Sequence, residues 1–140
     1  MKKTILLFAV IGFITMAATT KPSFANDKAN KKYELTIEKY KACIDACNAC
    51  IISCNSCESM CTMGKDAKMD RCIQLCKECV SVCTAASELM TLDSEYAKDI
   101  CTTCAKICDK CATECEKSTM EKCKDCAAAC RITAKLCKEM

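Results

Sequence analysis

The sequence has 140 residues, enough for one domain, and it contains 19 cysteines but no histidine. Lysine and arginine exceed aspartate and glutamate by three, but three lysines lie in residues 1–25, so the remainder has 18 basic and 18 acidic residues. This balance, with only tyrosines as aromatic residues after residue 25, argues against a basic, base-stacking nucleic-acid surface. The lack of histidine excludes Cys-His pairs, Ser-His-Asp triads and Glu-x-x-His di-iron sites. The sequence thus predicts a protein that is not an enzyme of these classes.

Residues 1–25 have the pattern of a secretory signal peptide. Two lysines precede an apolar run over residues 5–18, and small residues come just before Asn26, as at a cleavage site. The apolar run is shorter than the ~20 residues that a membrane span needs, which disfavours a retained anchor. We therefore predict an exported protein, periplasmic or otherwise extracytoplasmic, with one domain over residues 26–140 and no membrane contact after cleavage.

The domain is predicted to be helical throughout. Gly64 is the only glycine after residue 25, and neither glycine nor proline follows it, so helix breaks are few. A first helix is expected over residues 31–63 and a second ending near Glu88. The expected boundary residues are Gly64 as a C-cap, Asp66 opening the second helix, Thr91 or Asp93 as the next N-cap, and Ser118 with Glu121 as a capping box. Short turns between four helices predict an all-α fold, an antiparallel up-down-up-down four-helix bundle.

Cysteines recur every three or four residues in each predicted helix, apart from one step of seven residues between Cys130 and Cys137. This spacing averages 3.5 residues, the repeat that keeps one seam of a helix turned toward a packing partner. The seams hold all 19 cysteines: Cys43, Cys47, Cys50, Cys54, Cys57, Cys61, Cys72, Cys76, Cys79, Cys83, Cys101, Cys104, Cys108, Cys111, Cys115, Cys123, Cys126, Cys130 and Cys137. Isoleucine, leucine and valine at heptad spacing flank these seams and widen each apolar face. The sequence therefore predicts a bundle with a cysteine-lined core.

Four interpretations of the cysteines compete. Packing alone is a weak reason to fill a core with small, reactive side chains, although free cysteine is commonly buried. A disulfide scaffold suits an exported chain, yet 19 is odd, and Cβ atoms four residues apart on a helix are about 5 to 6 Å apart, against about 3.5 to 4.5 Å in a disulfide. Disulfides between cysteines of different helices are still compatible with the sequence. The alternative function is therefore that of a structural or interaction protein held together by disulfides.

The other two interpretations are redox catalysis and metal binding. Pairs such as Cys101 and Cys104 have the Cys-x-x-Cys spacing, but redox enzymes need one accessible pair at a helix start, usually beside strands. Metal binding fits the geometry, because two sulfurs that share an ion lie within about 4 to 5 Å when each metal–sulfur bond is about 2.3 Å. Bound ions also supply cohesion to a core of small side chains.

Charge favours a monovalent metal. Each Cu(I) ion that replaces a thiol proton leaves the core neutral, whereas zinc with four thiolates leaves two negative charges per buried site. Soft thiolates select Cu(I), zinc or iron–sulfur clusters, and the bacterial ferredoxin spacing is absent. We therefore predict multiple Cu(I) ions, about one per cysteine.

The sequence resembles the bacterial copper storage proteins, which are cysteine-filled four-helix bundles. The resemblance covers residues 33–140 and depends on repeated Cys-x-x-x-Cys and Cys-x-x-Cys spacings, as in Cys43, Cys47 and Cys50. It implies storage or sequestration of Cu(I) in a preformed bundle, typically a homotetramer, with a copper-accepting protein partner unidentified.

Methionines gather at one predicted end of the bundle, here called the methionine end. They are Met60, Met63, Met69 and Met120. Thioethers are soft, uncharged ligands, which suits capture and handover of Cu(I), although methionine also fills irregular gaps. The opposite, apolar end is expected to be a plug formed by Tyr40, Leu89, Met90, Leu92, Tyr96, Leu136 and Met140. We expect Cu(I) to enter and leave at the methionine end.

Overall fold

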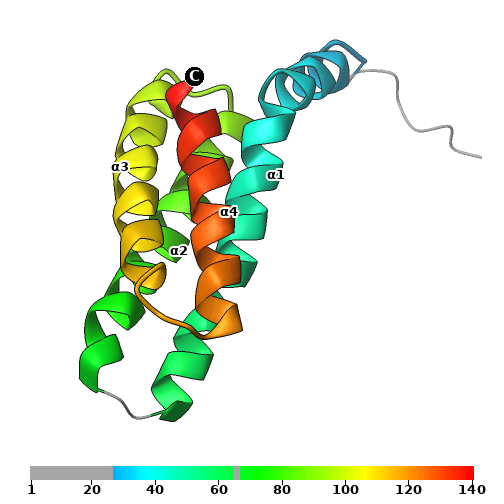
Figure 1. The fold of residues 1–140 in the computed structure, drawn as a ribbon. Coiled ribbons are helices and arrows are strands. Elements are labelled where there is room, and N and C mark those ends of the chain that lie inside the picture. The colour runs from blue at the N-terminus through cyan, green and yellow to red at the C-terminus, as the bar shows by residue number, and fades with distance from the viewer. Residues whose placement is uncertain (1–26, 65–66) are drawn as a thin grey trace, which may run out of the picture.

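The computed structural model describes residues 27–64 and 67–140. Its helices are α1 (Asp27–Gly64), η1, a short 3-10 helix (Ala67–Met69), α2 (Asp70–Thr91), α3 (Ala97–Cys115) and α4 (Glu121–Lys138). The four α-helices alternate in direction and form an antiparallel bundle (Figure 1). The predicted all-α, four-helix fold is confirmed. The predicted signal peptide and the expected helix start at Asp66 lie outside the described residues.

The four helices pack as the corners of a square. α1 contacts α2 and α4, and α3 contacts the same two helices. Residues 28–35 of α1 are exposed, and continuous burial of its seam begins at Thr36. The first turns of α1 therefore extend beyond the bundle, and Figure 1 shows them leaning away from the other helices.

The turn after α2 differs from the prediction. Asp93 has a φ of 51°, its N–H bonds to the Met90 carbonyl, and the Ser94 N–H bonds to the Leu89 carbonyl. These two bonds form a Schellman motif with Asp93 at the left-handed position. The prediction that Thr91 or Asp93 is the N-cap of the third helix is therefore wrong, because Thr91 ends α2 and Tyr96 precedes α3.

Two other predicted caps also fail. The Ser118 hydroxyl accepts a hydrogen bond from the N–H of Met120, which is itself the N-cap of α4, so no capping box forms with Glu121. Gly64 is the last residue of α1 and has no positive φ. The Ser118 hydroxyl thus bonds to the backbone just before α4 rather than to its first turn, and Gly64 ends α1 without adopting the left-handed conformation of a glycine C-cap.

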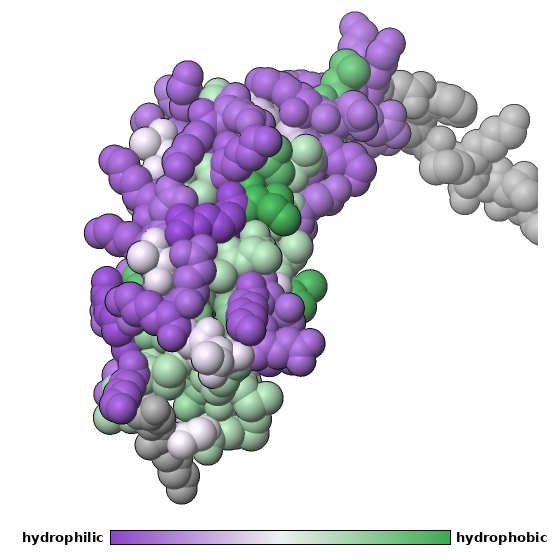
Figure 2. All heavy atoms as spheres, viewed as in Figure 1, coloured by the Kyte–Doolittle hydropathy of each residue, from purple (hydrophilic) through white to green (hydrophobic). Residues whose placement is uncertain are grey.

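The outer surface is polar over most of the bundle. In Figure 2, hydrophilic residues cover the upper part of the visible face, while moderately hydrophobic residues gather toward the lower end, where α1 meets α2. Arg131 of α4 joins α3 through Asp109 at 3.2 Å and Glu116 at 2.9 Å. Such exposed pairs stabilise little individually, so cohesion depends on the core. Within residues 27–64 and 67–140, no helix has both the length and the apolar character to cross a membrane.

Candidate metal centre

All 19 cysteines have free thiols and lie in the core, none more than 4% exposed. Flanking heptad residues line the same core, with Leu75 and Val82 buried and Ile44, Ile51, Ile100 and Ile107 partly buried against it. The seam prediction is therefore correct for every cysteine. The aliphatic side chains supply the apolar contacts that small cysteines lack, so the bundle has a reason to fold before metal binds.

The thiols form two ladders in a fixed antiparallel register. A step of three or four residues along α1 matches an equal step back along α4, and the same holds for α2 and α3. Sγ–Sγ distances in the α1–α4 ladder are all 3.5 Å: Cys43–Cys137, Cys50–Cys130, Cys54–Cys126 and Cys57–Cys123. In the α2–α3 ladder they are 3.4 to 3.9 Å: Cys72–Cys115, Cys76–Cys111, Cys79–Cys108 and Cys83–Cys104.

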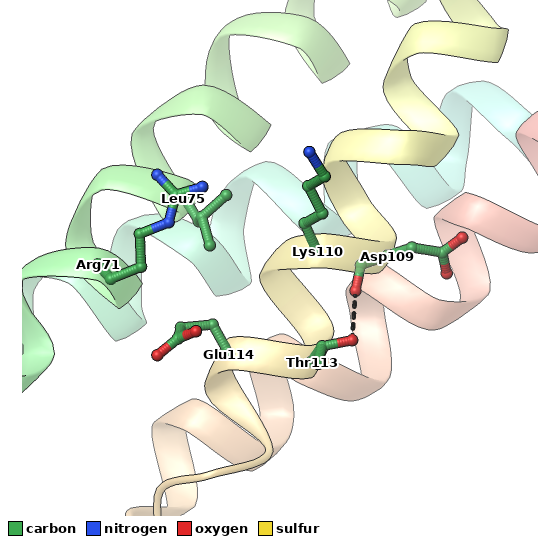
Figure 3. Close-up of a pocket in the computed structure, with 6 residues that line it drawn as sticks. All are labelled: Arg71, Leu75, Asp109, Lys110, Thr113 and Glu114. Atoms are coloured by element: carbon green, nitrogen blue, oxygen red, sulfur yellow. Dashed lines mark hydrogen bonds between the residues drawn. The ribbon is translucent and has the colours of Figure 1, made fainter.

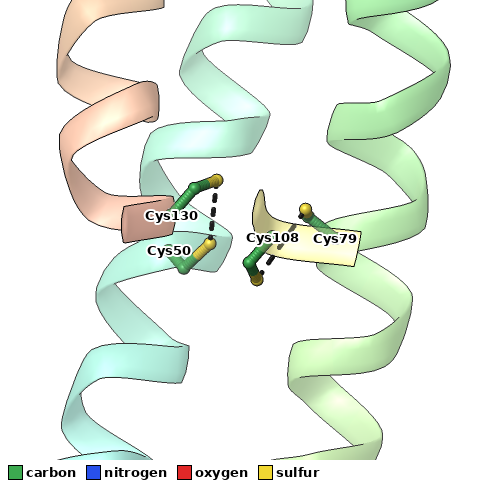
Figure 4. A group of neighbouring side chains, drawn as sticks. All are labelled: Cys50, Cys79, Cys108 and Cys130. Atoms are coloured by element: carbon green, nitrogen blue, oxygen red, sulfur yellow. Dashed lines mark hydrogen bonds between the residues drawn. The ribbon is translucent and has the colours of Figure 1, made fainter. Parts of the chain in front are cut away.

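The two ladders meet to form groups of four sulfurs. Cys50, Cys79, Cys108 and Cys130 come from four different helices, and their sulfurs lie within 4.8 Å of one another (Figure 4). Neighbouring groups share members, since Cys130 and Cys79 also belong to a group with Cys54 and Cys111. Shared thiols indicate bridging ligands along a continuous column. The donor set of these groups is sulfur alone, which suits a soft ion.

Hydrogen bonds among the thiols shift their pKa values in opposite directions. A hydrogen bond from Cys137 lowers the pKa of Cys101 to about 4. A thiol that donates keeps its proton, so contact with Cys101 raises the pKa of Cys137. Near the methionine end, burial raises the pKa of Cys61 to about 12. Parts of the apo core therefore hold protons at neutral pH that a bound cation must displace.

The methionine end has a graded set of sulfur atoms. Met63 and Met60 are 69% and 39% exposed, while Met69 and Met120 are partly buried against the cysteine core. A surface depression beside them is lined by Lys68, Met69, Cys72, Glu114, Lys117, Ser118 and Thr119. It connects the surface to Cys72, the first thiol of the α2 seam. The structure therefore brings the four predicted methionines to one end, in pairs of different exposure.

The apolar end is only partly the predicted plug. Tyr40 is buried and its hydroxyl donates to Asp93 at 3.3 Å, but Leu92 and Tyr96 are 74% and 61% exposed. The plug prediction is wrong for these two side chains, because the Schellman turn places Leu92 and the following residues at the surface. Cys137 borders a depression with Lys98, Thr102, Ala105, Lys106, Lys138 and Met140.

The prediction missed the relation of Met90 to the cysteines. Met90 is fully buried, and its Sδ accepts a hydrogen bond from the Cys101 thiol at 3.8 Å. The sequence contains the signal, because the alternating spacing of four and three residues that ends at Cys83 continues to Ala86 and then Met90. Because Met90 lies among apolar residues in the sequence, it is predicted to be part of the apolar plug and not a member of the cysteine seam.

A depression on the outer face between α2 and α3 has a different character. Its lining is Arg71, Leu75, Asp109, Lys110, Thr113 and Glu114 (Figure 3). Leu75 is the aliphatic residue of this lining, and the Thr113 hydroxyl donates to the Asp109 carbonyl at 2.9 Å. No sulfur lines this depression, so it is separate from the thiol column.

Comparisons with known proteins agree with a sulfur-lined metal store. Residues 36–140 match the model of a family described as copper storage protein. The Cu(I)-bound copper storage protein BsCsp3 is 39% identical, with a TM-score of 0.68 over 72% of this chain and 96% of that one. Apo-Csp3 from Bacillus subtilis matches at 39% identity and 0.67, over 71% and 96% of the two chains. No curated protein matches the chain.

A third solved structure corrects the predicted localisation. It is a cytosolic copper storage protein from Streptomyces lividans with five coppers, 28% identical, with a TM-score of 0.68 over 76% of this chain and 94% of that one. The prediction of an exported protein is wrong by this comparison. The export prediction depended only on the local composition of residues 1–25, whereas the likeness to the Streptomyces lividans protein depends on the helical bundle. The disulfide alternative loses its premise of an oxidising compartment as well.

Proposed function

We propose that this chain, which belongs to the copper storage protein family, holds about one Cu(I) ion per core cysteine, up to about 19 ions. The metal-binding domain in this proposal is residues 26–140, and the ligands are the 19 cysteines together with Met60, Met63, Met69 and Met120 at the methionine end. The proposal is one of storage without catalysis.

The overlap of the four-sulfur groups carries the proposal. Zinc favours separate tetrahedral sites with four thiolates each, but neighbouring groups here share thiols such as Cys130 and Cys54. Shared thiolates suit Cu(I), which binds with few ligands and one positive charge per thiolate. A full column of equal numbers of copper ions and thiolates is neutral, so its burial avoids the cost of buried net charge.

Loading is an exchange of protons for copper. Where a Cu(I) ion replaces the proton of a thiol, the sulfur–hydrogen bond gives way to bonds between the ion and two or more shared sulfurs, one proton goes to solvent, and no oxidation state changes. Burial raises the pKa of Cys61, and contact with Cys111 raises that of Cys76, so these thiols are protonated before loading. Proton release is therefore part of the expected reaction.

We propose the methionine end as the route of entry and exit. Exposed thioethers at Met60 and Met63 are placed to meet an incoming ion first, and the partly buried Met69 lies beside Cys72 in the same depression. An ion that moves inward then exchanges a neutral ligand for a stronger thiolate at each step. Exposure that decreases from Met63 to Cys72 supports this order.

The proposal also includes assembly into a homo-oligomer. Large apolar side chains are exposed on two helices of the bundle, with Ile52 of α1 at 71% and Ile132 of α4 at 58%. Burial of such side chains against a second copy favours association. Light scattering on the purified protein is expected to give a mass several times that of one chain, and a monomer mass at all concentrations would contradict this part.

Anaerobic titration with Cu(I) tests the main proposal. We expect thiolate-to-copper absorbance to rise until about one ion per cysteine is bound, with at most about one proton released per ion in a pH-stat, because Cys101 with its lowered pKa is already deprotonated. Zn(II) serves as the matched control and is expected to compete weakly. Saturation at about four ions, with a preference for zinc, would contradict the copper assignment.

A further inference from the structure

The core contains a thioether sulfur that belongs to neither ladder of cysteines, the Sδ of Met90. Met90 is 0% exposed, whereas Met60 and Met63 are exposed and Met69, Met120 and Met140 are only partly buried. Its Sδ lies 3.8 Å from the Cys101 Sγ. Buried methionine is normally a filler of irregular gaps, but this one occupies a defined place in the register.

That place follows from the α2–α3 ladder. Each cysteine of α3 from Cys115 to Cys104 faces a cysteine of α2, and one further step in this register brings Cys101 opposite Ala86. Alanine offers no ligand atom. Met90 lies one helical turn beyond Ala86 on the same seam, and long side chains on a helix point back toward its N-terminus. Its sulfur therefore lies beside Cys101, where the ladder lacks a thiol.

Two more thiols complete the group. Cys43 and Cys137 lie 3.5 Å apart, and each interacts with Cys101. Tyr40 belongs to the same buried cluster at this end. We infer that Met90 is a copper ligand, and that with Cys43, Cys101 and Cys137 it forms the terminal Cu(I) site at the apolar end.

A thioether suits this position for a reason of charge. Cys43, Cys101 and Cys137 already supply three thiols at the last step of the column. A fourth thiolate would add a negative charge at this last site. No further copper ion follows on its outer side to neutralise that charge. A neutral sulfur adds a ligand without adding charge, so the buried site stays closer to neutral.

The experiment observes the Met90 methyl group during copper loading. This inference rests on the proposed copper storage, so the full chain with 13C-labelled methionine methyl groups is titrated with Cu(I) without oxygen. Loss of one resonance in Met90→Leu, a change that keeps volume, identifies the signal. We expect the Met90 methyl resonance to shift clearly more than that of Met140. We also expect Met90→Leu to release one ion to a Cu(I) chelator at about tenfold lower chelator concentration than the unaltered protein.

The matched control is Met140→Leu, the same change at the same end, which is expected to leave chelator release unchanged. Circular dichroism of the apo proteins checks that both variants keep their helix content. An unshifted Met90 methyl at full loading, or release curves of Met90→Leu and unaltered protein that coincide, would overturn the ligand role while copper storage stands. Failure of the unaltered protein to take up copper would instead overturn the proposed function itself.

Discussion

The two ends of the bundle differ in how the cysteine seams finish. At the methionine end the last cysteines are Cys61, Cys72, Cys115 and Cys123, and a further step of three residues on two seams leads to Met69 and Met120, which are only partly buried. At the apolar end the seams of α1, α2 and α3 continue to the buried side chains of Tyr40, Met90 and Ala97, and that of α4 leads to the partly buried Met140.

Burial of the thiols does not distinguish the ends, since Cys61 and Cys72 are 2% and 1% exposed and Cys43 and Cys137 are 4% and 3% exposed. The proposed exchange at one end and retention at the other therefore depend on the exposed thioethers of Met60 and Met63.

Both ends have a surface depression at a cysteine, Cys72 at the methionine end and Cys137 at the apolar end. The contacts between helices at the two ends differ more clearly. At the apolar end Tyr40 donates to Asp93, and Lys39 lies 3.5 Å from the same carboxylate, so α1 is tied to the turn after α2. The ends therefore differ in more than their sulfur ligands, because polar contacts between α1 and the turn after α2 also hold the apolar end together.

The largest expected effect comes from Leu75, a fully buried residue near the start of α2. Leu75→Ala is expected to lower the free energy of unfolding of the apo protein by about 2–5 kcal/mol, because it removes buried apolar volume. The loss should be smaller after copper loading, since bound ions then hold the helices together. Urea unfolding of both forms measures the two values.

Leu92→Ala is the control for Leu75→Ala, because Leu92 is 74% exposed and its loss should change stability by less than about 0.5 kcal/mol. Equal losses in apo and loaded Leu75→Ala would contradict a role for copper in cohesion.

The next effect is kinetic and concerns the methionine end directly. Joint replacement of Met60, Met63, Met69 and Met120 by leucine removes the thioethers but keeps apolar volume. Copper uptake and chelator removal should each slow by about tenfold, equal to about 1.4 kcal/mol in the barrier, while the final stoichiometry is unchanged. Stopped-flow absorbance measures both rates, with Met140→Leu as the control. Unaltered rates would return the four methionines to a packing role.

Alkaline and acid pH should affect one thiol of each end, Cys61 and Cys101, in opposite ways. Cys61 ionises at about 12 in the folded protein against 9.0 ordinarily, so its contribution to stability is complete below pH 9 and is lost as pH rises toward 12. The lowered pKa of Cys101, about 4, gives stability that is complete above pH 9 and is lost as pH falls through 4. In Cys61→Ala, the free energy of unfolding of the apo protein should fall less as the pH rises above 9. In Cys101→Ala, it should fall less as the pH falls toward 4. Urea unfolding from pH 4 to 11 checks both, and an unchanged pH dependence would contradict these assignments.

The fold and the thiol column could be predicted from sequence because both depend on periodicity. A spacing of three and four residues sets which face of a helix is buried, whatever the partner. Cysteines from Cys43 to Cys137 are therefore placed correctly without knowledge of contacts. Helix ends were predicted less well, since the left-handed position at Asp93 and the N-cap at Met120 are set by how neighbouring helices pack.

The role of Met90 shows where periodicity alone is insufficient. Its place on the seam is visible in the sequence, but its nearness to Cys101 depends on the register between α2 and α3. Register is a property of two helices together, so a single helical pattern cannot supply it. The exposure of Leu92 and Tyr96 is missed for the same kind of reason, since the turn that contains them has no repeating pattern.

The smallest expected effect tests whether the apolar end is closed independently of copper exchange. Tyr40→Phe removes the hydroxyl that donates to Asp93 at 3.3 Å but keeps the buried ring. The loss of one hydrogen bond should cost the apo protein about 0.5–1 kcal/mol, with Tyr96→Phe as an exposed control that costs less. If copper enters only at the methionine end, uptake in Tyr40→Phe should match that of the unaltered protein, because the loosened link lies at the far end of the column. Faster uptake in Tyr40→Phe would mean that ions also pass at the apolar end, beside Cys137 and its lysine-lined depression, and the functional difference between the ends would fail.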